Sequence, residues 1–283
     1  MRERIHLVII DPQNDFCDLP AACLPSDQTK PALPVAGAHA DMLRVAALID
    51  AAGAGLSDIS ITLDSHQHID IGHPTFWRQA DGSAVAPFTP ITLADVSAGR
   101  YMPRLPNALP RVLAYLERLE AAGRYTHMVW PVHCEIGAWG HNVHPAVRAA
   151  YNRWEEATLN SVNKVIKGAN PWTEHYSAIQ AEVPDPADPD TETNAGFIAL
   201  LRAADRVLIA GEAGSHCVKA TTEHLADAFG PNETGKLILL TDCISPVAGF
   251  ETQYAQFLAD MRACGLQTAK SSDLLIDLFK GLS

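Results

Sequence analysis

Short apolar runs alternate along this chain with longer segments whose apolar residues recur at helical spacing. The first run, residues 5–10, is followed at once by the polar sequence Asp11-Pro-Gln-Asn. A brief, uninterrupted apolar run that ends in turn residues is typical of a strand buried on both faces of a sheet. We therefore predict strands at residues 5–10, 60–63, 126–130, 162–166, 206–210, 236–241 and 267–270.

Helices are predicted between these strands, at residues 38–52, 109–122, 145–156, 194–203, 217–229 and 252–264. Parallel strands need crossover connections, so this alternation predicts an α/β protein with three α/β/α layers and a mostly parallel sheet. The candidate site residues come from both ends and the middle of the chain. We therefore expect a single domain over residues 1–283, with an insertion at about 74–125.

Three residues with suitable chemistry follow predicted strands. Cys217 lies where a run of small residues leads into a predicted helix, whose backbone N–H groups and dipole favour a thiolate and could hold an oxyanion. Asp11 and Lys167 each follow another strand. At one edge of a parallel sheet they would supply a base, a thiolate stabiliser and a nucleophile. The alternatives are a buried structural cysteine, a turn aspartate and a solvated lysine.

A second group of polar residues follows the strand predicted at 60–63. The segment Asp64-Ser-His66-Gln-His68 and the later His73 offer a carboxylate and several imidazoles within ten residues. These are typical ligands for zinc or a similar divalent ion. The alternative is a polar loop that binds no metal.

Four motifs resemble those of the isochorismatase-like cysteine hydrolases, and among them the nicotinamidases. They occur in the family's order and span nearly the whole chain: Val8-Ile-Ile-Asp-Pro-Gln-Asn-Asp-Phe16, Trp130-Pro-Val-His-Cys134, Lys167-Gly168 with Tyr176 downstream, and Gly211-Glu-Ala-Gly-Ser-His-Cys217. The resemblance implies the isochorismatase-like hydrolase fold and a catalytic triad of Asp11, Lys167 and Cys217. It also implies an oxyanion hole from the N–H groups of Ala213 and Cys217, beside a cis peptide between Glu212 and Ala213.

The same resemblance implies a metal site. Its ligands would be Asp64, His66 and His133, with His73 or His68 as a fourth ligand or an outer partner. We expect one divalent ion, zinc, with iron or manganese as alternatives. Substrate-pocket residues are also implied, and they are Phe16, Trp130 and Tyr176.

The chain departs from the family pattern at three places. Glu212 stands where the family generally has an apolar residue, and a carboxylate there would raise the thiol pKa unless it is paired or acts on the substrate. We therefore count Glu212 among the candidate substrate-binding residues. The insertion at 74–125 separates the two metal motifs. The acidic, proline-rich segment 181–193 is either a solvated loop or a lid.

Composition limits the possible partners. The net charge of −12 and the lack of a basic, aromatic-rich cluster argue against a nucleic-acid surface. No glycine-rich phosphate loop follows the first strand, no apolar stretch approaches the roughly 20 residues that span a bilayer, and the chain start lacks a secretory pattern. Six scattered cysteines then favour a reducing cytoplasm, with Cys134 as the one rival nucleophile. We expect a small-molecule substrate, no nucleic-acid or membrane partner, and a homo-oligomer.

Together these features predict a metal-assisted cysteine amidohydrolase of pyridine nucleotide metabolism. It would cleave nicotinamide, or a close analogue, to nicotinate and ammonia through a thioester intermediate. Two alternatives remain: an N-carbamoyl or ureido amidohydrolase of the same superfamily without a metal requirement, and a catalytically silent binding module.

Overall fold

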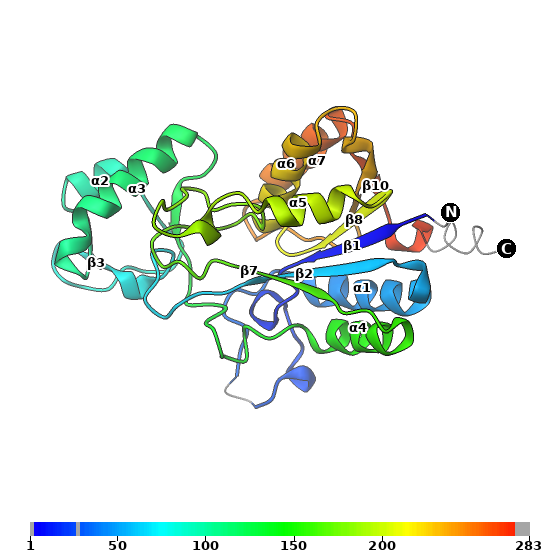
Figure 1. Ribbon diagram of the computed structural model, residues 1–283. Helices are drawn as coiled ribbons and strands as arrows, with labels where there is room; N and C mark the ends of the chain where they lie inside the picture. Colours follow the sequence, from blue (N-terminus) through cyan, green and yellow to red (C-terminus); the bar gives the residue numbers. More distant parts are fainter. Residues whose placement is uncertain (1–2, 27–28, 275–283) are drawn as a thin grey trace.

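A computed structural model of the protein describes residues 3–26 and 29–274 (Figure 1). Within them, a six-stranded sheet has the order β10-β9-β8-β1-β2-β7, and its neighbouring strands pair in parallel. Met1 and Arg2, part of the chain start considered above, lie outside the described residues, as does the end of the expected domain from residue 275. The strands are β1 (Ile5–Ile10), β2 (Asp58–Asp64), β7 (Asn163–Lys167), β8 (Arg206–Gly211), β9 (Leu237–Leu240) and β10 (Gln267–Ala269).

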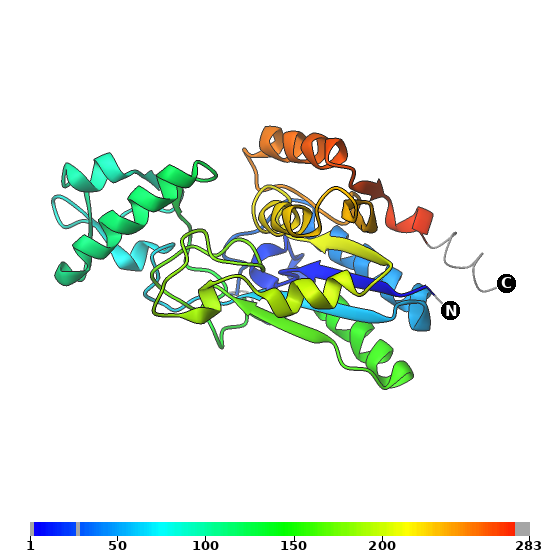
Figure 2. The same cartoon turned by 45° about the horizontal axis from the view of Figure 1, so that its top comes forward.

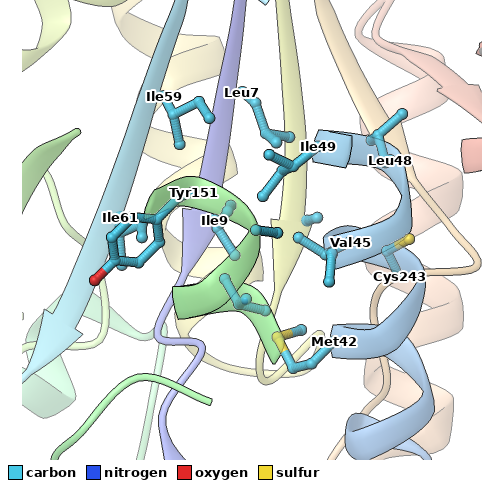
Figure 3. Packing of buried hydrophobic residues seen from close by; sticks show 14 of the residues in the cluster. Leu7, Ile9, Met42, Val45, Leu48, Ile49, Ile59, Ile61, Tyr151 and Cys243 are labelled. Carbon is cyan, nitrogen blue, oxygen red and sulfur yellow. The ribbon is translucent and has the colours of Figure 1, made fainter. Parts of the chain in front are cut away.

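Strand β1 lies at the centre of the sheet and is buried along its whole length. Leu7 and Ile9 belong to the apolar cluster on one face, whereas Val8 and Ile10 belong to the cluster on the other face. Helices α1 (Ala38–Ala52) and α4 (Pro145–Thr158) cover the first face, where Figure 3 shows Met42, Val45 and Ile49 beside Leu7 and Ile9. The second face is covered by α5 (Ala195–Arg202), α6 (Cys217–Phe229) and α7 (Glu251–Ala263).

The architecture therefore has the three α/β/α layers that the sequence predicts. Helix α1 has the predicted bounds, and Gly53 follows it with a positive φ of 48°, as helix C-caps often require. Helix α6 also has the predicted bounds, with Cys217 as its first residue.

Beside the sheet, residues 74–129 form a separate side lobe (Figures 1 and 2). Its elements enclose an apolar cluster of their own that includes Trp77, Val112 and Leu116. They are β3 (Trp77–Gln79), β4 (Thr89–Ile91), α2 (Leu93–Ser97), β5 (Tyr101–Pro103), α3 (Leu109–Ala122) and β6 (His127–Val129).

Strand β6 corrects one expectation. The run at 126–130 does form a strand, but it pairs antiparallel with β4 in a two-stranded sheet of the side lobe, not with the main sheet. The short elements α2, β3, β4 and β5 were not predicted. They carry too few residues to display a helical or strand period.

The acidic segment 181–193 packs against the side lobe. Asp185 accepts a hydrogen bond of 2.6 Å from Arg111 of α3, and the carbonyl of Pro184 accepts one from Arg118. Among the described residues, no helix combines the length and the apolar character needed to cross a membrane.

Candidate active site

The ends of β1, β7 and β8 bring three charged or nucleophilic side chains together at one edge of the sheet. Lys167 Nζ lies 2.9 Å from Asp11 Oδ2 and 3.6 Å from Cys217 Sγ. Asp11, Lys167 and Cys217 are at most 6% exposed. Lys167, the predicted stabiliser, therefore contacts both the predicted base and the predicted nucleophile.

Asp11 is held from the neighbouring strand. Its backbone N–H donates to the Thr62 hydroxyl of β2 at 2.9 Å, and that hydroxyl donates in turn to Asp11 Oδ1. Burial raises the pKa of Asp11, and the ammonium of Lys167 opposes that rise. A carboxylate with a raised pKa is a better proton acceptor than an ordinary surface aspartate.

A glycine lets β8 end close to β1 at this point. Gly211 has a φ of +119°, and a Cβ there would lie 2.0 Å from the Ile10 carbonyl oxygen. Any side chain would push the two strands apart. The Gly211 position therefore fixes how closely the Cys217 segment approaches Asp11.

Cys217 is the first residue of α6, so its N–H has no carbonyl acceptor within the helix. Burial raises the pKa of the thiol, Lys167 opposes the rise, and a hydrogen bond to Asp11 adds to it. The resting group is therefore a thiol, and Lys167 contacts its sulfur. The expected cis peptide is present between Glu212 and Ala213. Within the described part of the chain, the N–H groups of Ala213 and Cys217 donate to no other protein group, so both are available to an oxyanion.

The polar cluster after β2 gathers around the carboxylate of Asp64. Asp64 Oδ2 lies 3.0 Å from His66 Nε2 and 3.3 Å from His133 Nε2. One ring nitrogen from each of His66, His73 and His133 falls within 4.8 Å of the others, and all three rings are buried. His73 therefore joins this cluster, whereas the His68 ring contacts Glu135 at 3.0 Å with a side chain that is 60% exposed. The structure does not bring His68 to the site.

The chemistry of this cluster fits a divalent metal ion. Burial, followed by the neighbouring His133 and His66, lowers the pKa of His73 to about 2, so its imidazole is neutral and can act as a ligand. The buried Nδ1 of His73 has no hydrogen-bond partner. Asp70 Oδ2 lies 3.1 Å from His66 Nδ1, an arrangement in which a carboxylate orients a ligating imidazole. Asp70 was not singled out from the sequence, although it lies four residues after His66.

Lys167 joins the two clusters, because its Nζ also lies 2.9 Å from Asp64 Oδ1. Burial acts in the opposite direction, but His66 and Lys167 hold the pKa of Asp64 well below its usual range. The carboxylate is therefore charged, as a metal ligand requires.

A cavity opens onto both clusters. Trp130 donates a hydrogen bond from its indole N–H to the Tyr176 hydroxyl at 3.0 Å, which fixes two of the cavity walls. The expected pocket residues Phe16, Trp130 and Tyr176 all line it. The full lining is Phe16, Leu33, Asp64, Trp130, His133, Glu174, Tyr176, Ala213, His216, Cys217 and Val247.

Glu212 is not in this lining. The side chain is 0% exposed, and Glu212 Oε2 accepts a hydrogen bond from the Ser245 N–H. Burial and the adjacent carboxyl of Asp41 raise its pKa well above the usual range, so the group is protonated. The expectation that Glu212 contacts the substrate is therefore corrected: its neighbour Ala213 lines the cavity, and Glu212 packs against Ser245 and Asp41.

Two polar cavity residues were missed from the sequence. Glu174 is 5% exposed, its Oε2 has no hydrogen-bond partner, and burial raises its pKa to about 8. His216 accepts or donates a hydrogen bond with the Ser215 hydroxyl at 2.9 Å, and burial lowers its pKa to about 4. Their only sequence signal was position, since Glu174 lies between Lys167 and Tyr176 and His216 precedes Cys217.

The rival nucleophile Cys134 has a structural environment. It is 0% exposed, its N–H donates to Asp15 at 2.7 Å, and burial raises its thiol pKa well above the usual value. Among the described cysteines, Cys217 is the one that lines the cavity.

This architecture is the isochorismatase-like α/β fold. A nicotinamidase and pyrazinamidase of Acinetobacter baumanii superposes with a TM-score of 0.62 at 18% identity, over 96% of this chain and 98% of that one. The yeast nicotinamidase bound to the inhibitor nicotinaldehyde gives 0.62 at 17% identity, over 94% and 99% of the two chains. The pyrazinamidase of Pyrococcus horikoshii in complex with zinc gives 0.52 at 17% identity, over 94% and 99%.

At these identities the likeness establishes the fold. No family model matches the chain, and no curated protein matches it in sequence.

Proposed function

We propose that the protein is a metal-assisted cysteine amidohydrolase that cleaves the carboxamide of a planar aromatic ring, nicotinamide or a close analogue. The contact of Lys167 with both Asp11 and Cys217 carries this proposal. Cys217 supplies a nucleophile that lines the aromatic cavity, and Asp11 and Lys167 supply a proton acceptor and a positive charge beside it. The solved neighbours named nicotinamidase or pyrazinamidase, and the one solved with nicotinaldehyde, favour a pyridine-type ring.

The first half of the reaction forms a thioester. Asp11 takes the thiol proton, and the Cys217 sulfur attacks the amide carbon to form a C–S bond. The N–H groups of Ala213 and Cys217 hold the resulting oxyanion, and each such donor is worth about 3 kcal/mol. Asp11 then returns the proton to the nitrogen, the C–N bond breaks and ammonia leaves.

In the second half, a water molecule attacks the thioester carbon through its oxygen, and Asp11 accepts a proton from that water. The C–S bond breaks, the sulfur recovers the proton, and the carboxylic acid departs. Lys167 keeps its positive charge throughout and balances the charge on Asp11 or on the sulfur.

Asp64, His66, His73 and His133 would hold the divalent ion, zinc or else iron or manganese. When bound, the ion would act as a Lewis acid that orients a ring nitrogen of the substrate. The pyrazinamidase neighbour that was solved with zinc supports this assignment. Phe16, Trp130 and Tyr176 would flank the ring.

We place this reaction in a reducing cytoplasm, because the sulfur of Cys217 must stay unoxidised to act and all six cysteines are unpaired. The substrate is a small molecule, and a homo-oligomer remains a prediction that sedimentation would check.

Ammonia release from a panel of amides by metal-replete protein tests the proposal. We expect turnover of pyridine carboxamides, and its loss in Cys217→Ala. Cys134→Ala is the matched control, since it removes a buried thiol outside the cavity. An electrophilic amide analogue should label Cys217 in peptide maps. Turnover of ureido compounds alone by metal-free protein would instead support the related amidohydrolase, and no turnover of any member would support a binding module.

A further inference from the structure

The side lobe holds one aromatic residue in an unfavourable backbone conformation. Phe88 has a φ of +63°, and its side chain remains 53% exposed. The left-handed region is unfavourable for an L-residue, and it is rare for bulky side chains. Half-exposed, the ring recovers only part of that cost through burial.

The turn itself does not require a phenyl group. Phe88 N–H donates to the Val129 carbonyl at 2.6 Å, next to the β4–β6 pairing, and Val85 anchors the loop in the lobe core at 2% exposure. These backbone and anchoring contacts would hold a glycine at position 88 equally well. The phenyl ring therefore has another role.

Leu159 provides a contrast. It is also apolar and exposed, with a φ of +58°. It follows the last residue of α4, where a left-handed residue is the usual way to end a helix. Phe88 has no such explanation, because it precedes a strand.

The Phe88 ring lies against a wall of the cavity. Its edge meets the Trp130 indole with ring centroids 6.0 Å apart and planes at 85°. On the same indole, Phe250 lies at 6.5 Å, and Phe250 also contacts the His216 ring at 4.7 Å. Phe88 and Phe250 thus pack on the indole of Trp130, which itself lines the cavity, and the side lobe and the segment before α7 each contribute one of these phenyl rings.

We propose that Phe88 is a specificity-determining residue that selects ring carboxamides carrying an apolar substituent on the ring. This inference rests on the proposed function. A substituent that extends past Trp130 would bury itself against the exposed part of the Phe88 ring and displace water from it. The unsubstituted ring ends at Trp130 and gains nothing from that contact.

The test compares two glycine variants. Phe88→Gly removes the ring and suits the left-handed backbone, and Leu159→Gly is the matched control with a similar φ at a helix end remote from the cavity. kcat/KM is measured for nicotinamide and for nicotinamides methylated at each free ring carbon in turn. Phe88→Gly should lower the preference for at least one methylated substrate by about 5-fold, mainly through KM, and Phe88→Tyr should restore it. Leu159→Gly should leave every ratio unchanged.

A stability measurement accompanies the kinetics. Phe88→Gly should unfold at a midpoint no lower than that of wild type, which excludes a folding defect as the cause of the change. If the wild type turns over ring amides and Phe88→Gly keeps the same kcat/KM ratios between substrates, the role of Phe88 is overturned. The proposed function is unaffected by that result. No wild-type turnover of any ring amide would overturn the proposed function, and this inference with it.

Discussion

The main sheet and the side lobe hold the candidate site in different ways. The sheet supplies Asp11, Lys167 and Cys217 from strand ends and a helix start that are buried on every side. The side lobe covers residues 74–129 with a smaller apolar core, and its β6 leads into Trp130 and His133. The reacting groups thus come from the sheet and from the start of α6 beside it, whereas part of the cavity wall and of the metal cluster follows the lobe.

The reacting groups and the metal cluster can therefore respond differently to a substitution. A change in the sheet core displaces the reacting groups together, because they share one framework. A change in the lobe alters the entrance and the metal cluster while the Asp11, Lys167 and Cys217 contacts persist.

The metal cluster should couple the two regions, and its disruption should have the largest effect. His133 follows β6 of the lobe, whereas Asp64 ends β2 of the sheet. We expect His133→Ala to lose bound metal and to reduce turnover by more than the roughly 10- to 100-fold typical of outer-shell partners. His141→Ala is the control, since His141 contacts the Ser65 hydroxyl outside the cluster. Elemental analysis of the purified proteins measures occupancy, and full occupancy in His133→Ala would remove that residue from the site.

Core truncations should separate the two regions. Ile9 is 0% exposed in the sheet, and Leu116 is 0% exposed in the lobe. Each change to alanine should cost about 2–5 kcal/mol. Ile9→Ala should lower the global free energy of unfolding, whereas Leu116→Ala should mainly speed amide hydrogen exchange in residues 74–129. Equal exchange changes across the sheet and lobe in Leu116→Ala would show that the two unfold as one unit.

Acid should loosen the lobe before the sheet. Burial lowers the pKa of His127 in the lobe and of His6 in the sheet to about 4. Both rings stay neutral when folded, but the unfolded chain binds a proton near pH 6.5. The contribution of each neutral ring to the free energy of unfolding is therefore fully present above about pH 6.5. It falls by about 1.4 kcal/mol per pH unit per ring as the pH drops toward 4.

Because the apolar core of the lobe is smaller, we expect the lobe to unfold after a smaller loss of stability than the sheet. Trp77 reports on it, because its ring lies 5.5 Å from His127. Trp77 fluorescence should change at a higher pH than the far-UV circular dichroism of the sheet, and His127→Gln should move that change to lower pH. A single coincident transition would contradict separate loosening.

Much of the sheet could be predicted because its signals are local. The bounds of β1, α1, α3 and α6 follow from apolar periods and small-residue breaks within each segment. The pairing of β6 with β4 was not predictable in this way, because residues 92–126 separate the two strands and no short-range pattern specifies such pairing.

At the candidate site, the directions of individual side chains could not be predicted from the sequence. The order of motifs located Asp11, Lys167 and Cys217 at one edge. It could not tell that Ala213 lines the cavity while the adjacent Glu212 lies beside Asp41, because a motif gives the order of residues and not the direction of each side chain. Glu174 entered the cavity for a similar reason: the path of the loop after Lys167 decides which of its side chains face inward.

The smallest effect should come from the contact between the lobe and segment 181–193. Arg111 lies 4.2 Å above the Trp172 ring and 2.6 Å from Asp185, with a side chain that is 45% exposed. An exposed ion pair contributes about 0–1 kcal/mol, and stacking on an indole adds a similar amount. Arg111→Leu should therefore lower the free energy of unfolding by about 1 kcal/mol. Arg153→Leu, which removes the more exposed pair with Asp50, should cost less. Urea unfolding of both variants makes the comparison. A larger loss in Arg153→Leu would show that the contact of Arg111 with segment 181–193 contributes less stability than the exposed ion pair of Arg153 with Asp50.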